Sequence, residues 1–597
     1  MRFTTRPEIA GTFGVATSTH WIASAVGMRI LEAGGNAFDA AVAMGFTLNV
    51  VEPHLNGPLG EVPILACAAH QDNPVVICGQ GVAPAAATIA HYRAEGLSEV
   101  PGSGLLAAVV PGAFDAWMIL LRDFGTLPLR DVMEPAIGYA ADGHPLLASA
   151  AGVIAGMAGF FAEEWPSSAA VWLPGGQAPQ PGARFRNPDL AAFWTRLLAE
   201  AEAAHGREAQ IEAARAAFYR GFVAETIGDF AQNTALRDAT GRRRRGVLSA
   251  EDMARWQAGI EAPLSVAYRG WRVFKTGFWG QGPMLLQALR ILEGFDVAAL
   301  DPQGADFVHL VTETLKLVMA DREAHYGDPD CADIPAGTLL SRAYAESRRA
   351  LISDRASMEQ RPGRLPGREA LADRAVARAS ASSAPGDAAG TGEPTMAHLA
   401  ERRGDTVHLD VIDRWGNIVS ATPSGGWLQS SPVVPGLGVP LNTRAQMFWL
   451  DETSPSALAP GKRPRTTLTP SLAGPDGARP SLAFGTPGGD QQDQWQLILF
   501  LRIVDHGQNL QEAIDAPLFH TAHAQGSFWP RRARPGHLMA ESRFGEAVLE
   551  ELRGRGHRLE VAEPWSVGRL TAARREADGI LKAAATPRLM QAYAVGR

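Results

Sequence analysis

The 597-residue chain has few cysteines, and none of them forms a recognisable metal or disulfide motif. Only Cys67, Cys78 and Cys331 are present, and no two of them make a Cys-x-x-Cys pair. An odd and low number of cysteines argues against a disulfide framework and against a zinc site built from thiolates. All three stand among apolar or mixed neighbours, so we expect them to be small buried residues.

The chain also lacks a long apolar run and an excess of basic charge. No stretch approaches the roughly 18 apolar residues that a membrane span requires, and the first twenty residues lack the apolar core of a signal peptide. The formal net charge is −8, whereas nucleic-acid binding calls for clustered basic residues. These absences predict a cytoplasmic protein with no membrane or nucleic-acid partner.

The regular elements that the sequence predicts are a mixture of helices and strands. A helix is expected from His20 to the glycines at 34–35, and a second from Asn36 to about Val51. Strands are expected within residues 62–70, 74–82 and 270–278. Further helices are expected at 281–296, from Asp306 onward, and at 491–505. The composition is that of an ordinary globular protein.

The composition changes near residue 360. The stretch PGRLPGREALADRAVARASASSAPGDAAGTGEP is rich in Ala, Gly, Pro, Ser and Arg and contains hardly any large apolar residue. Such a segment cannot bury enough surface to offset its chain entropy. We therefore predict a flexible linker at 360–405, between one region at 1–359 and another at 406–597.

A β-hairpin follows this linker directly. Val407, Leu409 and Val411 alternate with polar residues, DRWGN forms a turn, and IVSAT returns. If the turn is centred on Trp415, the numbers of facing residues sum to about 830, which places Thr406 opposite Ser424. Taken alone, such a pair of hydroxyl groups is compatible with a purely structural role.

A flexible segment that ends on a hydroxyl-bearing strand residue is typical of a self-cleaving precursor. The Thr406 hydroxyl would attack the carbonyl carbon of Asp405, and hydrolysis of the resulting ester would leave Thr406 with a free α-amino group. That amine could then act as the base for its own hydroxyl, so that one residue supplies both nucleophile and base.

Two adjacent glycines, Gly488 and Gly489, stand between a predicted strand and a predicted helix in GTPGGDQQDQW. Glycines at a helix entrance expose backbone N–H groups that no Cβ covers. They suit an oxyanion hole, in which one lost donor typically costs about 3 kcal/mol in the transition state. The alternative is an ordinary glycine-rich turn.

Segments along nearly the whole chain resemble, in order, those of the γ-glutamyltransferase family. The matching segments are GGNAFDAAVAMGFTLNVVEPHLNG, APAAAT, VPGAFDAWMILLRDFGTLPLRDVMEPAIGYAADG, LKLVMADREAHYGDPD, TVHLDVIDRWGNIVSAT, KRPRTTLTPSL, GTPGG and NLQEAIDAP. The resemblance implies an N-terminal-nucleophile hydrolase of the α+β class, with a four-layer αββα sandwich. It also implies large and small fragments cut from one precursor, which could pair further as a dimer, and no metal or organic cofactor.

The resemblance assigns roles to individual residues. Thr406 matches the catalytic threonine, with cleavage between Asp405 and Thr406. Ser424 matches a second hydroxyl hydrogen-bonded to that nucleophile. Gly488 and Gly489 match the oxyanion-hole pair. Thr466 and Thr467 match a hydroxyl pair that helps to hold the substrate head group.

Several positions depart from the family pattern. Gln80 stands where the family has an arginine for the substrate α-carboxylate, and Leu59 replaces a usual glycine. Gly426, Arg444 and Met447 stand where amide and acidic residues bind the α-amino group. A buried polar ligand group left without a partner costs about 1–3 kcal/mol.

These departures disfavour an amino-acid head group. Arg444 would instead favour a carboxylate or another anion, although a structural surface arginine is the alternative. We therefore predict a threonine amidohydrolase or acyltransferase of the acylase branch, acting on a small amide with an anionic acyl part. A second hypothesis is a genuine γ-glutamyltransferase or glutathione hydrolase, and a third is an unprocessed binding protein on the same fold.

Overall fold

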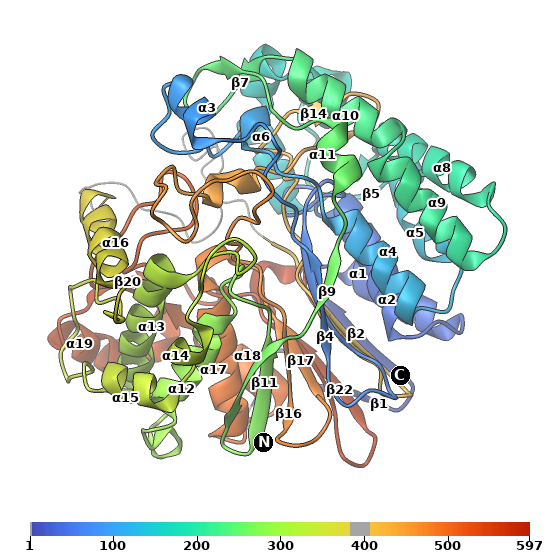
Figure 1. Cartoon of the computed structure of the whole chain (residues 1–597). Helices are drawn as coiled ribbons and strands as arrows, with labels where there is room; N and C mark the ends of the chain where they lie inside the picture. Colours follow the sequence, from blue (N-terminus) through green and yellow to red (C-terminus); the bar gives the residue numbers. More distant parts are fainter. Residues whose placement is uncertain (1–2, 383–405) are drawn as a thin grey trace.

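Two seven-stranded antiparallel sheets stack face to face in the computed structural model, which describes residues 3–382 and 406–597 (Figure 1). One sheet has the order β1 (Ile9–Gly11), β22 (Leu581–Ala585), β21 (Thr571–Arg575), β17 (Leu482–Gly485), β16 (Ser471–Pro475), β11 (Trp271–Lys275) and β10 (Leu264–Tyr268). The other has the order β23 (Tyr593–Gly596), β2 (Gly14–Ser18), β12 (Leu409–Asp413), β13 (Ile418–Ala421), β3 (Val62–Cys67), β4 (Val75–Gly79) and β9 (Gly259–Glu261).

The alternating direction of side chains along each strand separates the core between the two sheets from the cores under the helices. In the β12–β13 hairpin, Ile412 and Ile418 point between the sheets and pack in one cluster with Leu472 and Ala573 of the facing sheet. Val411, which directly precedes Ile412, belongs to a different cluster on the outer face of the sheet. Successive side chains of a strand point to opposite faces, so each central strand is buried on both sides.

Helices cover both outer faces (Figure 1). The sheet that contains β12 packs against α1 (Trp21–Glu32), α2 (Ala37–Val51) and α4 (Ala113–Phe124). The opposite sheet packs against α12 (Pro283–Leu292), α13 (Ala305–His325) and α17 (Gln492–Val504). The predicted four-layer αββα sandwich is therefore confirmed.

The helix starts follow the capping residues that the sequence offers. The His20 side chain accepts from the backbone N–H of Ile22 at the start of α1. Asn36 and Asp39 form a reciprocal capping box at the start of α2. Both predicted helices are confirmed to within two residues at each end. None of the helices in the described part of the chain is long and apolar enough to cross a membrane.

Part of the predicted linker is folded. Residues 369–382 form helix α16 (Glu369–Ser382), which packs against α13 and buries Ala372, Ala375 and Ala379. The prediction of an unfolded segment is thus wrong for this stretch, because a stripe of alanines suffices for a close helix contact. Residues 383–405, including Asp405, lie outside the described residues.

The cysteine prediction was right for two residues and wrong for the third. Cys67 and Cys78 are buried between the sheets, whereas Cys331 is exposed in the turn after α13. The neighbours of Cys331 include Asp330 and Asp333, and such a mixed context did not indicate burial at this turn.

Asp413 connects the hairpin turn to helix α2. Its Oδ2 accepts from the backbone N–H of Ala37 (2.9 Å) and from Asn417 Nδ2 (2.7 Å). Its Oδ1 accepts from the backbone N–H groups of Trp415 and Asn417, both at 3.0 Å. One buried carboxylate thereby sets the turn and fixes the helix start against it.

We expect Asp413→Ala to destabilise the protein by about 3 kcal/mol, because three backbone N–H groups lose their acceptor and each such bond contributes about 1 kcal/mol. Urea unfolding followed by circular dichroism would measure the change. Asp578→Ala is the control, since Asp578 is exposed and accepts one backbone bond in a turn. Equal losses for the two variants would contradict this account of Asp413.

Candidate active site

The β12–β13 hairpin brings the two predicted hydroxyl groups together. Leu409 pairs with Ala421, so the predicted register is confirmed. Beyond the strand ends, the backbone N–H of Val407 donates to Pro423 O (3.1 Å). Thr406 Oγ1 then lies 3.3 Å from Ser424 Oγ, with both residues buried.

The backbone pairing continues from Ser424 to Glu61, a residue that was not among the predicted site residues. The backbone N–H of Glu61 donates to Ser424 O (2.9 Å), and that of Ser424 donates to Glu61 O (3.0 Å). Directly paired residues of antiparallel strands project their side chains from the same face. Thr406, Ser424 and Glu61 therefore form a row across three neighbouring strands.

Glu61 forms a buried ion pair with Arg444. The Glu61 carboxylate accepts from Nε of Arg444 and pairs with its Nη2, and both side chains are inaccessible to solvent. Burial raises the pKa of Glu61, and the adjacent Arg444 guanidinium opposes that shift. The prediction placed Arg444 at the site as an anion-binding cation, and the structure adds a partner that neutralises it.

Met447, one of the positions at which the family binds the substrate α-amino group, lies in an apolar wall. Met447 packs in a buried cluster with Trp427 and Phe528. The Arg444 guanidinium lies over both rings, 5.0 Å from the centroid of Trp427 and 5.8 Å from that of Phe528. Gly426 has a φ of 66°, which favours glycine. This wall presents rings and a thioether next to the hydroxyl row.

A polar network lies under the hydroxyl row, between the sheets. His408 Nδ1 is 2.9 Å from Thr422 Oγ1, and its Nε2 is 2.9 Å from Asp410 Oδ1. Asp410 also accepts from Ser420 Oγ (2.8 Å) and from Thr571 Oγ1 (3.0 Å) of the facing sheet. These bonds fix β12, β13 and β21 relative to one another, directly below Thr406.

The glycine pair starts next to this network. A Cβ on Gly485 would lie 2.1 Å from His408 Cε1, so β17 ends in contact with β12. Gly488 and Gly489 follow with φ of 133° and 53°. Gln281 Nε2 donates to Gly489 O (3.0 Å), while N–H groups at a helix start have no helical partner. Both glycines have positive φ values that favour glycine, and their role as an oxyanion hole stays a prediction.

The remaining predicted substrate residues are buried. Thr466 is held by a bond from its backbone N–H to Trp279 O (2.9 Å), and Thr467 follows it in the loop before β16. Gln80 lies just after β4 and donates from Nε2 to Gly81 O (3.1 Å), while its Oε1 has no hydrogen-bond partner among the described residues. Their contacts with substrate stay predictions.

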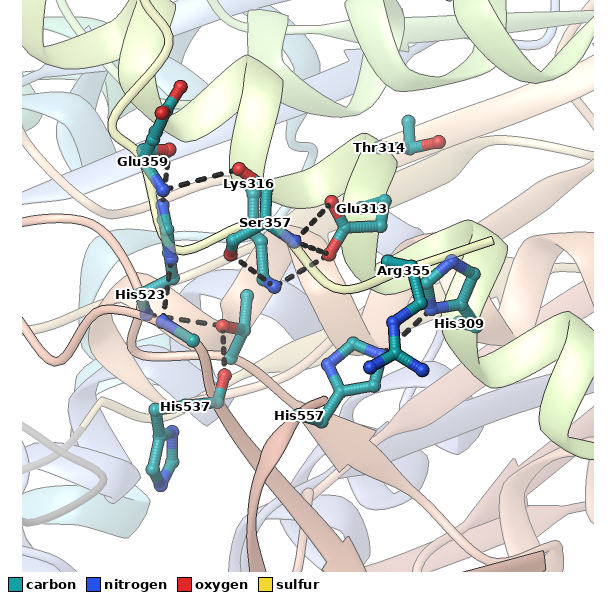
Figure 2. Close-up of polar contacts among 12 residues, drawn as sticks. His309, Glu313, Thr314, Lys316, Arg355, Ser357, Glu359, His523, His537 and His557 are labelled. Atoms are coloured by element: carbon teal, nitrogen blue, oxygen red, sulfur yellow. Dashed lines mark hydrogen bonds and ion pairs between the residues drawn. The ribbon is translucent and has the colours of Figure 1, made fainter. Parts of the chain in front are cut away.

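Among the described residues, one group has the donor set for a metal ion, and none of the predicted site residues belongs to it (Figure 2). Ligand atoms of His309, Glu313 and His557 all lie within 4.8 Å of one another. However, the Glu313 oxygens already accept from Lys316 Nζ (2.6 Å) and Arg361 Nη2 (3.0 Å). A divalent ion would stand beside both cations, so we interpret this cluster as a structural link between α13 and the segment at 353–361.

Comparison with known proteins agrees with the geometry. A family model described as Gamma-glutamyltranspeptidase matches residues 23–596. The acylase ACY 1 proenzyme of Pseudomonas sp. (strain SE83) is 33% identical over 592 residues, which cover 96% of this chain and 92% of the relative. The oxamate amidohydrolase proenzyme of Klebsiella pneumoniae is 31% identical over 587 residues, with 97% of each chain covered.

Glutathione hydrolases are also among the relatives, for example the proenzyme of Escherichia coli at 27% identity, with 98% of this chain and 92% of the relative covered. Among solved structures, LmbA2991HD shares 53% identity and superposes with a TM-score of 0.92 over 100% of both chains. The relatives thus include acylases, an amidohydrolase and glutathione hydrolases.

We expect Gly488→Ala to lower kcat about 100-fold, since a displaced oxyanion donor costs about that much. The new Cβ would lie 2.3 Å from Trp495 Cζ3 and would be strained at the observed φ. Steady-state amide hydrolysis would measure the loss. Gly138→Ala in α5 (Leu129–Asp142) is the control, because a Cβ there meets nothing within 4 Å. Similar kcat values for both variants would refute the oxyanion role.

Proposed function

The chain belongs to the gamma-glutamyltranspeptidase family, and we propose that it is a self-processing threonine amidohydrolase of the acylase branch. The observation that carries this proposal is the buried pair of Thr406 Oγ1 and Ser424 Oγ, 3.3 Å apart, at the entrance to β12. The names of the acylase and oxamate relatives as proenzymes support a precursor that is cut.

The first reaction is the cleavage of the chain itself. Thr406 Oγ attacks the carbonyl carbon of Asp405, the peptide C–N bond breaks, and the peptide nitrogen becomes the free α-amino group of Thr406. Water then hydrolyses the ester that joins Asp405 to Thr406 Oγ. The products are fragments 1–405 and 406–597, which remain together because β12 and β13 lie between strands of the first fragment.

The second reaction is the hydrolysis of a small amide. The α-amino group of Thr406 takes the hydroxyl proton as Oγ attacks the amide carbon, and the same proton passes to the leaving amine. Ser424 Oγ stabilises the nucleophile by hydrogen bonding, and the N–H groups of Gly488 and Gly489 hold the oxyanion. Water then releases the acyl group, or an amine accepts it.

We propose that the acyl part of the substrate is anionic. Oxamate, the substrate named for one relative, is an amide whose acyl part carries a carboxylate. Arg444 at the hydroxyl row is a second supporting feature, although Glu61 neutralises part of its charge. The genuine γ-glutamyltransferase or glutathione hydrolase is the second candidate, and the glutathione hydrolases among the relatives favour it.

Mass spectrometry of the purified wild-type protein should show two fragments with a break after Asp405. Thr406→Ala should remain a single chain, because it lacks the attacking oxygen, whereas Thr453→Ala in an exposed turn should be cut normally. An intact wild-type chain after prolonged incubation would refute self-processing and would favour the unprocessed binding protein.

The processed enzyme should hydrolyse the p-nitroanilide of glutaric acid with a kcat/KM at least 10-fold above that of the pentanoic p-nitroanilide. The two acyl groups differ only in the terminal carboxylate, and a hydrogen bond to a charged group contributes about 1.5–3 kcal/mol. Release of p-nitroaniline measures both rates. A preference for the uncharged anilide would contradict an anionic acyl group.

A further inference from the structure

One oxygen of Glu61 lacks a hydrogen-bond partner at the end of the hydroxyl row. The carboxylate is fully buried, and Oε1 takes the bonds from Arg444. Oε2 has no hydrogen-bond partner among the described residues. A buried charged acceptor that stays unsatisfied costs more than the 1–3 kcal/mol of a neutral one, so the site is expected to supply a donor when it is occupied.

The backbone places this oxygen beside the reaction centre. Glu61 is the direct pairing partner of Ser424, and Ser424 contacts Thr406. Two strand spacings separate Glu61 from Thr406, or about 10 Å between their backbones, and both side chains project from the same face. An acyl group bound to Thr406 Oγ1 that extends along this row would bring a substituent toward Glu61.

The backbone around Glu61 leaves the carboxylate little room to move. A Cβ on Gly425 would lie 2.5 Å from Glu61 Oε1 and 2.7 Å from Oε2, and Gly425 has a φ of 77°. A Cβ on Gly60 would lie 2.1 Å from Ser424 O. Glycines at both positions thus let the carboxylate pack against the turn that follows Ser424. Arg444 holds Oε1, so the carboxylate has a fixed position.

We propose that Glu61 is a specificity-determining residue whose Oε2 accepts a hydrogen bond from a hydroxyl or ammonium group on the acyl part of the substrate. This proposal rests on the proposed function and narrows its substrate class to anionic acyl groups that also carry a donor. Glu61, which directly precedes β3, would take over the role of the acceptors that are missing at Gly426 and Met447. A purely structural Glu61 would serve only as the counter-charge of Arg444.

Three p-nitroanilides with one carbon skeleton test the proposal: those of glutaric acid, of 2-hydroxyglutaric acid at C5, and of glutamic acid at its γ-carboxyl group, which is also C5. They differ only at C2, which carries hydrogen, hydroxyl or ammonium four bonds from the reacting carbon. The wild-type enzyme should favour at least one donor-bearing anilide over the glutaric one by about 10-fold in kcat/KM, as expected for one buried hydrogen bond.

Glu61→Gln should abolish this preference. The amide oxygen must face Arg444, so the NH2 group takes the place of Oε2 and an acceptor becomes a donor. Glu541→Gln is the matched control, because Glu541 is equally buried and paired with Arg588 (2.9 Å between Oε1 and Nε) at a distant position. That variant should lose stability but keep the preference among the three anilides.

The outcomes separate the two proposals. Equal wild-type rates on all three anilides, or an equal fall on all three in Glu61→Gln, would overturn the role of Glu61 and leave the amidohydrolase intact. No hydrolysis of any anilide by processed wild-type enzyme would overturn the acyl class and this inference with it. If Glu61→Gln does not fold, the single variant Arg444→Gln can be compared with the double variant Glu61→Gln/Arg444→Gln. These two variants again differ only at residue 61, and the double variant contains no unpaired buried cation.

Discussion

The register of the β12–β13 hairpin between β2 and β3 is the constraint on which the site depends. Leu409 pairs with Ser18 on one side and with Ala421 on the other, and Ser420 pairs with Leu65. A slip of one residue would turn every side chain of the strand to the other face. It would move the Thr406 hydroxyl from the space between the sheets toward the helices. The proposed nucleophile, Thr406, is therefore positioned by the packing of the two sheets.

The same register concentrates polar groups where the two sheets meet. His408, Asp410 and Ser420 lie on the face that elsewhere carries Ile412 and Ile418. Buried polar groups of this kind are tolerated only when each has a partner, and Thr571 of the facing sheet supplies one of them. The bonds of His408 and Asp410 tie β12, β13 and β21 together directly below the contact between Thr406 and Ser424.

The sequence predicted those parts of the site that depend on nearby residues. The Thr406–Ser424 pair follows from one short hairpin, and the entrance of α17 follows from two glycines in a row. Glu61 escaped prediction because it meets Ser424 through a strand pairing that spans most of the chain, although the altered segment NGPLGEVP was a visible signal. Helix α16 was missed because its buried residues are alanines. The prediction assumed that a segment without large apolar residues cannot form a core.

The ion pair between Glu61 and Arg444 changes how the departures from the family pattern are interpreted. Considered one at a time against the family pattern, Arg444 adds a positive charge to the site and Met447 removes a hydrogen-bond acceptor. In the fold, Arg444 arrives together with a carboxylate, so the net charge of the wall hardly changes. Burying one of these charges without the other would cost several kcal/mol. The contributions of Glu61 and Arg444 to stability are therefore coupled. If Glu61 accepts from the substrate as proposed, the acceptor stands next to β3 instead of at Gly426 or Met447, and the pair has to be considered together.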